Sequence, residues 1–443
     1  MGTVRMVADA ARLIANCYRS REHVDRLRTR RLREQLRYAF DASPFYRERF
    51  REAGLAREDL EAASVDSLPT LSPRTLESEF DRIVTDPDVT LSGVRSFLAT
   101  ATRGERYRGE YVVLNSSGSE GEPTPFLYDE REWDRSLAAT MRAMVAALGL
   151  RRLGQNTLGE TRTAYVAGIE GNFMGITGVE AVTDRLGGRL EAIPPSTSAD
   201  DLAERLTVFD PTGLVGYPST LVAVADLVAE GRCRVRPGHV LSGGEPLPAD
   251  TRRYLQETFD APVVNLYSTT ETGPLGVEPP DAPGMYLFDD LAFVEPREDR
   301  TLVTPLHHRT LPLIRFELGD TLEPRSRPPD ARLPFTIVES VVGRSEDLLR
   351  FDEGILFSTA LNEVDAPGAT RFQFVRSGPS HLEVRYERRP GADPEAVGRR
   401  VRESADSLLA DRGMGGVTVS VEEAELAFDP RTGKTPLVVH GDD

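Results

Sequence analysis

The chain is poor in cysteine and histidine and has no long apolar run. Its two cysteines, Cys17 and Cys233, lie far apart in the sequence, which excludes a dense disulfide framework or a cysteine-rich zinc cluster. The six histidines show no HxxxH or HExxH spacing, and we expect the adjacent pair His307 and His308 on a loop surface rather than at a metal. No stretch approaches the ~18 to 20 apolar residues that cross a bilayer, and the first twenty residues lack the core of a secretory signal. We therefore expect a cytoplasmic protein without a membrane partner.

Acidic residues outnumber basic ones, 71 to 54. The net charge of −17 argues against nucleic acid as the main partner, because phosphate contacts need a basic surface. ATP is not excluded, since a local site with a divalent cation can satisfy its few charges. Hydrophobic residues at 39% and charged residues at 28% are ordinary for a folded protein, and 443 residues suggest two or three domains.

The pattern of residue types changes twice along the chain. The segment from residue 8 to about 60 is expected to be helical, with the arginines between Arg19 and Arg37 on a solvated face. Beyond a proline-containing connection at 67–76, short β-rich runs alternate with helical stretches, which predicts a largely parallel sheet covered on both sides. The predicted strands are 110–115, 163–168, 213–217, 239–244 and 262–267, and the helices are 130–150, 219–231 and 248–259.

Past residue 340 the order becomes β-β-α-β. A hairpin is expected over 371–389, followed by a helix that Asp393 caps with Pro394 in its first turn, and a strand over 417–426. We predict an α/β chain of two domains. The large N-terminal domain, residues 1–342, has a mostly helical lead-in over 1–75 and mainly parallel sheets covered by helices. The small, mobile C-terminal domain, residues 343–443, is α+β.

Two segments are informative about chemistry, although the first taken alone is weak, since Ser/Gly loops are usually plain loops, and the second has a polar turn as its structural alternative. The small-residue loop at 114–126 follows a predicted strand, and its backbone amides and hydroxyls could hold phosphate oxygens, although it is not a Walker A loop. The segment 241–276 contains a glycine turn, a helix, a strand and then a polar loop, and ligands of open parallel sheets gather at the carboxyl ends of strands. There Tyr267 could stack on a purine, and Glu271 is a hard oxygen ligand that suits Mg²⁺.

Three further segments are weaker on their own. The first, 311–320, ends in Asp320, whose carboxylate could hold ribose hydroxyls; the second, 341–349, contains Arg344; and the third, 429–439, contains Lys434 on a glycine turn. Each has a plain structural alternative, such as a salt-bridged aspartate or an exposed arginine or lysine.

Together and in this order the five segments resemble the adenylate-forming superfamily of acyl-CoA synthetases, peptide-synthetase adenylation domains and luciferases. The length of the chain and the sequences of its motifs are most similar to the phenylacetate-CoA ligase branch of that superfamily. The resemblance covers roughly residues 105–443, with about 40 residues at the front also fitting that branch. It implies an ATP-dependent, Mg²⁺-assisted ligase that activates a small carboxylic acid as its acyl-AMP and releases pyrophosphate, with CoA as the expected second substrate. A homodimer, common in this branch, stays open.

The resemblance also implies the role of each motif residue. Thr270, Glu271 and Lys434 match the catalytic residues: Thr270 and Glu271 contact the α-phosphate and the magnesium ion, and Lys434 is carried in by the small domain during adenylation. Glu346 falls at the hinge, and Phe173, Gly175 and Tyr217 lie in the segments expected to line the acyl pocket. The ATP and AMP contacts are expected from Ser116, Ser117, Gly118, Ser119, Gly121, Gly243, Gly244, Glu245, Pro246, Tyr267, Ser268, Thr269, Asp320 and Arg344.

The sequence departs from the family pattern at two places. Glu120 and Glu122 stand in the phosphate loop where the family has threonine and lysine. The segment 351–364 lacks the RGxN motif that the family usually has after the hinge. Carboxylates beside a triphosphate repel it by about a kcal/mol or more unless they point outward or share the metal. Two alternatives to CoA ligation therefore remain: transfer of the acyl group to an amine or a carrier protein, as in specialised metabolism, and a non-catalytic nucleotide-binding homologue.

Overall fold

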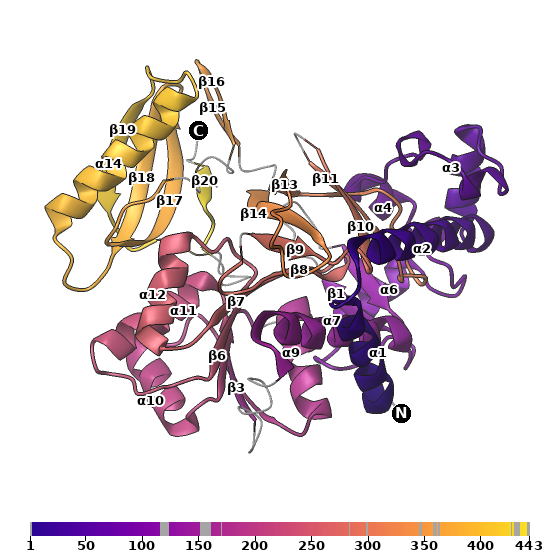
Figure 1. Cartoon of the computed structure of the whole chain (residues 1–443), viewed down its shortest axis with the longest axis horizontal. Coiled ribbons are helices and arrows are strands. Elements are labelled where there is room, and N and C mark those ends of the chain that lie inside the picture. Colours follow the sequence, from indigo (N-terminus) through magenta and orange to yellow (C-terminus); the bar gives the residue numbers. More distant parts are fainter. Residues whose placement is uncertain are drawn as a thin grey trace.

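The structure is a computed structural model, and two sets of elements with separate cores make up the chain (Figure 1). It describes residues 2–115, 124–150, 161–169, 171–282, 284–297, 300–344, 348–357, 361, 364–426, 428 and 435–440.

The chain begins with three helices, as the sequence predicts. They are α1 (Gly2–Asn16), α2 (Arg21–Ala42) and α3 (Pro44–Glu52). Ser20 caps α2, and Ser43 caps α3 through the amide of Tyr46, with Pro44 in the first turn, where its missing N–H costs nothing. Three shorter helices follow: α4 (Pro73–Ser78), α5 (Phe80–Ile83) and α6 (Leu91–Leu98).

The arginine-rich face of α2 is only partly solvated, so that expectation was wrong. Arg21 and Arg28 reach the carboxylate of Asp289, at 2.9 and 3.1 Å, and the Asp289 side chain is only 4% exposed. The neighbouring Asp290 accepts from Arg142 at 2.7 Å, and both of these side chains are fully buried. The two aspartates lie some 260 residues beyond α2 in sequence, so nothing local could reveal them.

A nine-stranded sheet forms the centre of the larger part, in the order β13-β14-β9-β8-β7-β6-β5-β3-β4. Strands β4, β3, β5, β6 and β7 are parallel, whereas β8, β9, β14 and β13 continue the sheet antiparallel. The strands are β3 (Arg162–Val166), β4 (Arg189–Ile193), β5 (Gly213–Gly216), β6 (His239–Gly243), β7 (Val263–Thr269), β8 (Gly273–Glu278), β9 (Met285–Leu287), β13 (Asp320–Pro324) and β14 (Thr336–Arg344).

Helices cover both faces of the parallel half, which confirms the α/β prediction. Figure 1 shows α10, α11 and α12 on one side and α7 and α9 on the other. Their bounds are α7 (Glu130–Leu148), α9 (Met174–Arg185), α10 (Ala199–Phe209), α11 (Pro218–Ala229) and α12 (Ala249–Phe259). The buried residues of α10, α11 and α12 form one apolar cluster with β3, β5, β6 and β7.

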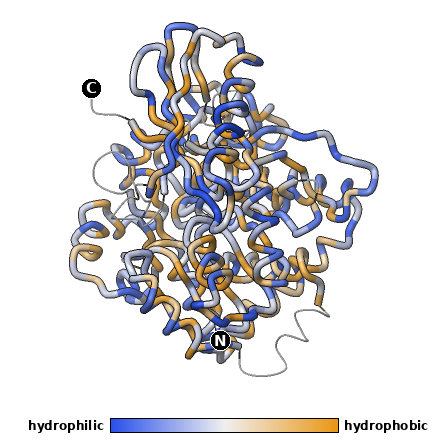
Figure 2. The backbone as a smooth tube through the Cα atoms, turned by 90° about the vertical axis from the view of Figure 1, so that its left-hand side faces the viewer, coloured by the Kyte–Doolittle hydropathy of each residue, from blue (hydrophilic) through white to orange (hydrophobic). Residues whose placement is uncertain are grey.

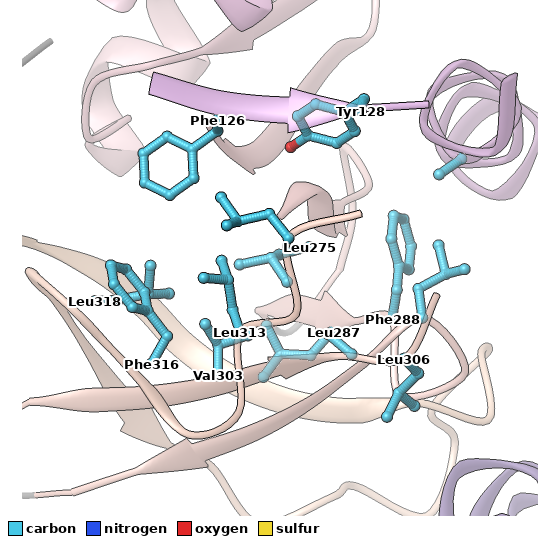
Figure 3. Packing of buried hydrophobic residues seen from close by; sticks show 14 of the residues in the cluster. Phe126, Tyr128, Leu275, Leu287, Phe288, Val303, Leu306, Leu313, Phe316 and Leu318 are labelled. Atoms are coloured by element: carbon cyan, nitrogen blue, oxygen red, sulfur yellow. The ribbon is translucent and has the colours of Figure 1, made fainter. Parts of the chain in front are cut away.

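The largest core lies where two smaller sheets meet the antiparallel half. The hairpin of β1 (Val112–Asn115) and β2 (Pro125–Tyr128) sits over β8, and a three-stranded sheet of β10 (Ala292–Pro296), β11 (Thr301–Pro305) and β12 (Phe316–Leu318) faces it. Figure 3 shows Phe126 and Tyr128 on β2 above Leu275, with Leu313 and Phe316 below. This packing fixes the ends of β1 and β2 against the strand end of β7.

The C-terminal part has its own four-stranded sheet, in the order β19-β18-β17-β20, with α14 packed against it. Its elements are β17 (Ala369–Gly378), β18 (His381–Arg388), α14 (Pro394–Asp411), β19 (Thr418–Glu423) and β20 (Val438–His440), preceded by the hairpin β15 (Leu348–Phe351) and β16 (Gly354–Phe357). Asp393 caps α14 through two backbone amides with Pro394 next to it, as predicted. The boundary at 342/343 stays a prediction.

Hydrophilic and hydrophobic stretches are interspersed along the whole backbone (Figure 2). Within the described part of the chain, no helix combines the length and apolarity that a membrane crossing needs.

Candidate functional site

Three of the predicted motifs meet at the end of β7. Tyr267 is 7% exposed, and its hydroxyl donates to Oδ2 of Asp320 at 2.8 Å. Asp320 begins β13, and its register partner on β14 is Arg344. Burial, followed by the nearby charge of Asp320, raises the pKa of Tyr267 well above its usual range. The tyrosine is therefore a neutral donor that fixes the aspartate carboxylate beside its own ring.

The polar loop after β7 is held by the β1–β2 hairpin. The Tyr128 hydroxyl donates to the carbonyl oxygen of Thr270 at 2.7 Å, and the Thr270 hydroxyl donates to the carbonyl of Asn115 at 3.4 Å. Asn115 ends β1 and immediately precedes the predicted phosphate loop. Gly273 closes the turn with φ +73°, and a Cβ there would lie 2.7 Å from the Ser136 hydroxyl. The loop therefore needs a glycine for both its conformation and its close contact with α7.

Several predicted residues lie outside the described part of the chain. These are Ser116, Ser117, Gly118, Ser119 and Gly121 of the phosphate loop, with Glu120 and Glu122, the hinge residue Glu346 and the catalytic candidate Lys434. Their roles stay predictions. What the structure shows is that Asn115, at the entrance of the phosphate loop, contacts Thr270, and that Thr435, the residue after Lys434, contacts Glu245.

The GGEP segment lies beside β7 at the same edge of the sheet. Gly243 ends β6 opposite Leu266, and a Cβ on Gly243 would meet the Leu266 carbonyl oxygen at 2.9 Å. Gly244 turns the chain with φ +80°. The Glu245 side chain then points to α11, where its oxygens accept from the amide and the hydroxyl of Ser219 at 3.1 and 3.0 Å. Its carboxylate also accepts from the amide of Thr435 at 2.8 Å.

One carboxylate of this edge suits a magnesium ion. Glu271 is half-buried on the loop after β7, and in the described residues no group of three or more potential metal ligands occurs. A full protein cage is therefore missing from that part of the chain. Mg²⁺ usually keeps several waters and binds through one or two carboxylates together with substrate phosphates. A single half-buried glutamate after a strand end fits that pattern.

The residues expected to line the acyl pocket form a small apolar cluster of their own. Tyr217 and Tyr165 are buried, and Phe173 packs against this cluster at the start of α9. A Cβ on Gly175 would lie 2.5 Å from the Tyr165 hydroxyl, so this position has no room for a side chain. Burial raises the pKa of Tyr217 to about 12. The observed arrangement is ordinary close packing next to the strand ends, and a substrate role stays a prediction.

Sequence reasoning missed a buried layer behind Thr270 and Glu271. His308 is 3% exposed, and its ring meets the Tyr128 ring edge-on at 4.7 Å. Burial lowers the pKa of His308 to about 3, and a hydrogen bond with the backbone of Glu271 opposes that shift. The expectation of a loop surface was wrong because α2 and α7 cover this loop: Gln35 donates to the His308 carbonyl, and Glu132 accepts from the Thr310 amide at 2.8 Å. A glutamine on the otherwise apolar face of α2 was the one available signal.

The chain has distant relatives among characterised ligases. No protein-family model matches it. Phenylacetate-coenzyme A ligase of Escherichia coli (strain K12) is 23% identical over 88% of this chain and 85% of its own length. The enzyme of that name from Pseudomonas putida is 24% identical over 75% and 73%. Protein CapK of Staphylococcus aureus is 20% identical over 76% and 73%.

Solved structures share the whole fold. A 2-hydroxyisobutyryl-CoA ligase in the postadenylation state superposes with a TM-score of 0.70 at 20% identity, covering 94% of this chain and 89% of that one. The same ligase in the thioesterification state gives 0.59 at 19% identity, over 96% and 91%. The chain is therefore similar over most of its length to phenylacetate-coenzyme A ligases, and it shares the fold of a CoA ligase that forms an acyl-AMP.

Proposed function

We propose that this protein activates a carboxylic acid with ATP as an acyl-AMP, with release of pyrophosphate, and then passes the acyl group to CoA. The observation that carries the proposal is the convergence of separate motifs on one strand end. The Tyr267 hydroxyl donates to the Asp320 carboxylate at 2.8 Å, and Arg344 on β14 is the register partner of Asp320 on β13. The Thr270 hydroxyl donates to the carbonyl of Asn115, the residue that precedes the small-residue loop. The relatives named phenylacetate-coenzyme A ligase, with similarity over most of both chains, support the same activity.

The chemistry follows from charge. A carboxylate must approach the α-phosphorus of ATP, so two anions come together, and the site has to offset that repulsion. We assign adenine stacking to Tyr267, the ribose hydroxyls to Asp320 with Arg344, and the α-phosphate to Thr270. A magnesium ion, when bound at Glu271, would offset phosphate charge. Lys434 would supply a second positive charge next to the reacting carboxylate.

The acid is proposed to be small, either aromatic or a short acyl group. Phe173 and Tyr217 present apolar rings next to the strand ends of β3 and β5. The Tyr165 hydroxyl lies so close to Gly175 that this position has no room for a side chain. A compact, flat substrate fits such surroundings better than a long chain.

The experiment is a screen for carboxylate-dependent pyrophosphate release over aromatic, short aliphatic and amino acids, followed by a comparison of acceptors. Release that depends on an acid, with consumption of CoA, supports the proposal. AMP release that depends on an amine or a carrier protein instead of CoA points to the alternative acceptor, which the departure at 351–364 favours. Binding of ATP without any acid-dependent release would contradict the proposal and leave a nucleotide-binding homologue.

Substitution of the C-terminal lysine tests the assigned mechanism. We expect Lys434→Ala to abolish carboxylate-dependent pyrophosphate exchange, because the charge that offsets anion repulsion is lost, while ATP binding measured by calorimetry stays nearly intact. Arg388→Ala serves as a control, since it removes a cation of the same part of the chain that pairs with Glu423 instead. Equal exchange rates in Lys434→Ala and the parent protein would reject this role.

A further inference from the structure

The Glu245 carboxylate is shared between a helix end and a distant segment of chain. Toward α11 it accepts from the amide and the hydroxyl of Ser219, at 3.1 and 3.0 Å, inside the first turn. The N-cap residue of α11, Tyr217, gives no side-chain cap. A carboxylate at a helix N-terminus satisfies free amides and suits the helix dipole, so Glu245 acts as the missing cap.

The second partner of the carboxylate comes from the far end of the chain. Oε1 accepts from the amide of Thr435 at 2.8 Å, across 190 positions of sequence. Beyond Thr435 the chain joins the small sheet. The side-chain amide of Gln373 donates to the Pro436 carbonyl at 3.2 Å, and the backbone amide of Phe374 donates to the Leu437 carbonyl at 2.8 Å. Residues 435–437 are therefore held by Glu245 on one side and by β17 on the other.

The contact lies at the interface between the two parts. A cavity of about 60 Å³ lies there, with Glu245, Thr251, Phe372 and Thr435 in its lining. Next to it the Thr251 hydroxyl donates to the Thr370 carbonyl at 3.1 Å. Ser219 belongs to the same part of the chain as Glu245, so of these contacts of the carboxylate only the one with the Thr435 amide is lost when the two parts separate.

The amide that Glu245 accepts from belongs to the peptide bond between Lys434 and Thr435. We propose that Glu245 is a positioning residue: its carboxylate docks residues 435–437 against the N-terminus of α11 in the arrangement in which acyl-AMP forms. The inference rests on the proposed function for its kinetic consequence, but the docking contact itself does not.

The contact is tested without substrates by hydrogen–deuterium exchange of the full chain. Glu245→Ala removes the acceptor, so we expect faster uptake in peptides that cover 435–440, while the β17–β18 hairpin keeps the uptake of the parent. Ser219→Ala is the matched control, because it removes one α11 contact of the carboxylate and leaves the Thr435 contact in place; its uptake over 435–440 should equal that of the parent. Unchanged uptake in Glu245→Ala would overturn the docking role.

The consequence for the reaction is tested by separating the two half-reactions. A hydrogen bond to a charged group is worth enough to change a rate about ten- to a hundredfold, so acyl-AMP formation by Glu245→Ala should fall by about that factor. Thioester formation from supplied acyl-AMP should stay close to the parent, since it does not need the docked arrangement. Glu245→Gln keeps an oxygen acceptor and should recover part of the loss. An equal loss in both half-reactions would overturn the proposal.

The two experiments, deuterium exchange and half-reaction kinetics, also distinguish a failure of this inference from a failure of the proposed function. If the parent protein forms no acyl-AMP from any acid, the proposed function fails, and deuterium uptake still decides whether Glu245 docks residues 435–437. If Glu245→Ala raises uptake throughout the chain, it has unfolded, and Glu245→Gln then carries both measurements.

Discussion

At the scale of single residues, one hydroxyl joins the tyrosine at the end of β7 to the aspartate that begins β13. The Tyr267 donor and the Asp320 acceptor are 2.8 Å apart in a buried setting. A hydrogen bond to a charged acceptor contributes about 1.5 to 3 kcal/mol. If Asp320 binds ribose, loss of this donor frees its carboxylate to turn away while the aromatic ring stays in place.

We therefore expect Tyr267→Phe to raise the KM for ATP about tenfold, with a smaller change in kcat, because the ring still stacks but the ribose contact is less well oriented. Steady-state kinetics with ATP as the varied substrate measure this. Tyr111→Phe is a matched control, since Tyr111 also donates to an aspartate, Asp86, at 2.8 Å, away from the strand ends of the sheet. A similar rise in KM for both variants would show that the effect is general loss of packing.

Motif order selected the candidate site residues, but not how they are connected. Tyr267, Asp320 and Arg344 could be chosen from the sequence because each stands in a recognisable segment. Their convergence, and the tie between Thr270 and Asn115, depend on pairings between distant strands. His308 was misjudged for the same reason: two polar neighbours on a loop look exposed until the helices that cover them are known.

At the scale of elements, α2 is attached to the large core by charge as well as by apolar packing. Asp289 receives Arg21 and Arg28 from the helix and both the amide and the hydroxyl of Thr336 from β14. The same two arginines also pair with Asp25 on the surface of α2, where that side chain is 38% exposed. The two arginines thus have a buried acceptor, Asp289, in the core and an exposed acceptor, Asp25, on their own helix.

We expect Asp289→Ala to lower the melting temperature of the large part and to speed proteolysis between α1 and α2. The loss leaves two half-buried guanidinium groups and the Thr336 amide without their acceptor, which costs about 2 to 4 kcal/mol. Asp25→Ala, which removes only the exposed partner, should cost less than about 1 kcal/mol. Thermal unfolding and limited trypsin digestion of both variants provide the comparison. Equal destabilisation would mean that burial of the acceptor does not matter.

The sequence predicted the regular elements well where the hydrophobic periodicity and the length of a segment both indicated the same type of element. Four of the five parallel strands, β3, β5, β6 and β7, and the helices α7, α11 and α12 appear within a few residues of the expected bounds, and the capped helix α14 begins at Pro394 as expected. The fifth parallel strand, β4, was not predicted, and the predicted strand 110–115 is β1, which pairs antiparallel with β2 in a separate sheet. The antiparallel extension through β8, β9, β14 and β13 was not predicted, nor was the sheet of β10, β11 and β12. These strands are mostly three to six residues long, and several end at prolines, so their pattern is too short to separate from loops.

At the scale of the whole molecule, buried histidines are unevenly distributed between the two parts. Burial lowers the pKa of His239 to about 4 and that of His308 to about 3, and it lowers that of His307 well below its usual range. All three lie in the larger part. Among the residues whose side chains the structure describes, the C-terminal part has only His381, which bonds to Thr418 and Ser420.

A histidine with a depressed pKa contributes stability above pH 6.5, and this contribution is lost as the pH falls toward its folded pKa. At pH 5 each of the three costs about 2 kcal/mol. Glu132 acts in the opposite direction: burial raises its pKa to about 7, so its penalty, present at pH 8, is largely relieved at pH 5, a gain of about 2 kcal/mol. The histidines outweigh it, and the larger part should lose about 3 to 4 kcal/mol between pH 8 and pH 5.

Because the two parts have separate cores, we expect two calorimetric transitions that respond differently to acid. Between pH 8 and pH 5 the transition of the larger part should move to lower temperature, while that of the C-terminal part moves less. His239→Gln removes one of the three buried imidazoles, about 2 kcal/mol of the net 3 to 4, and should reduce the acid shift by about half, whereas His23→Gln, on α2 and outside this buried set, serves as the control. A shift of equal size in both transitions would contradict this account and would also weaken the proposed boundary at 342/343, since it would mean that the two cores unfold as one.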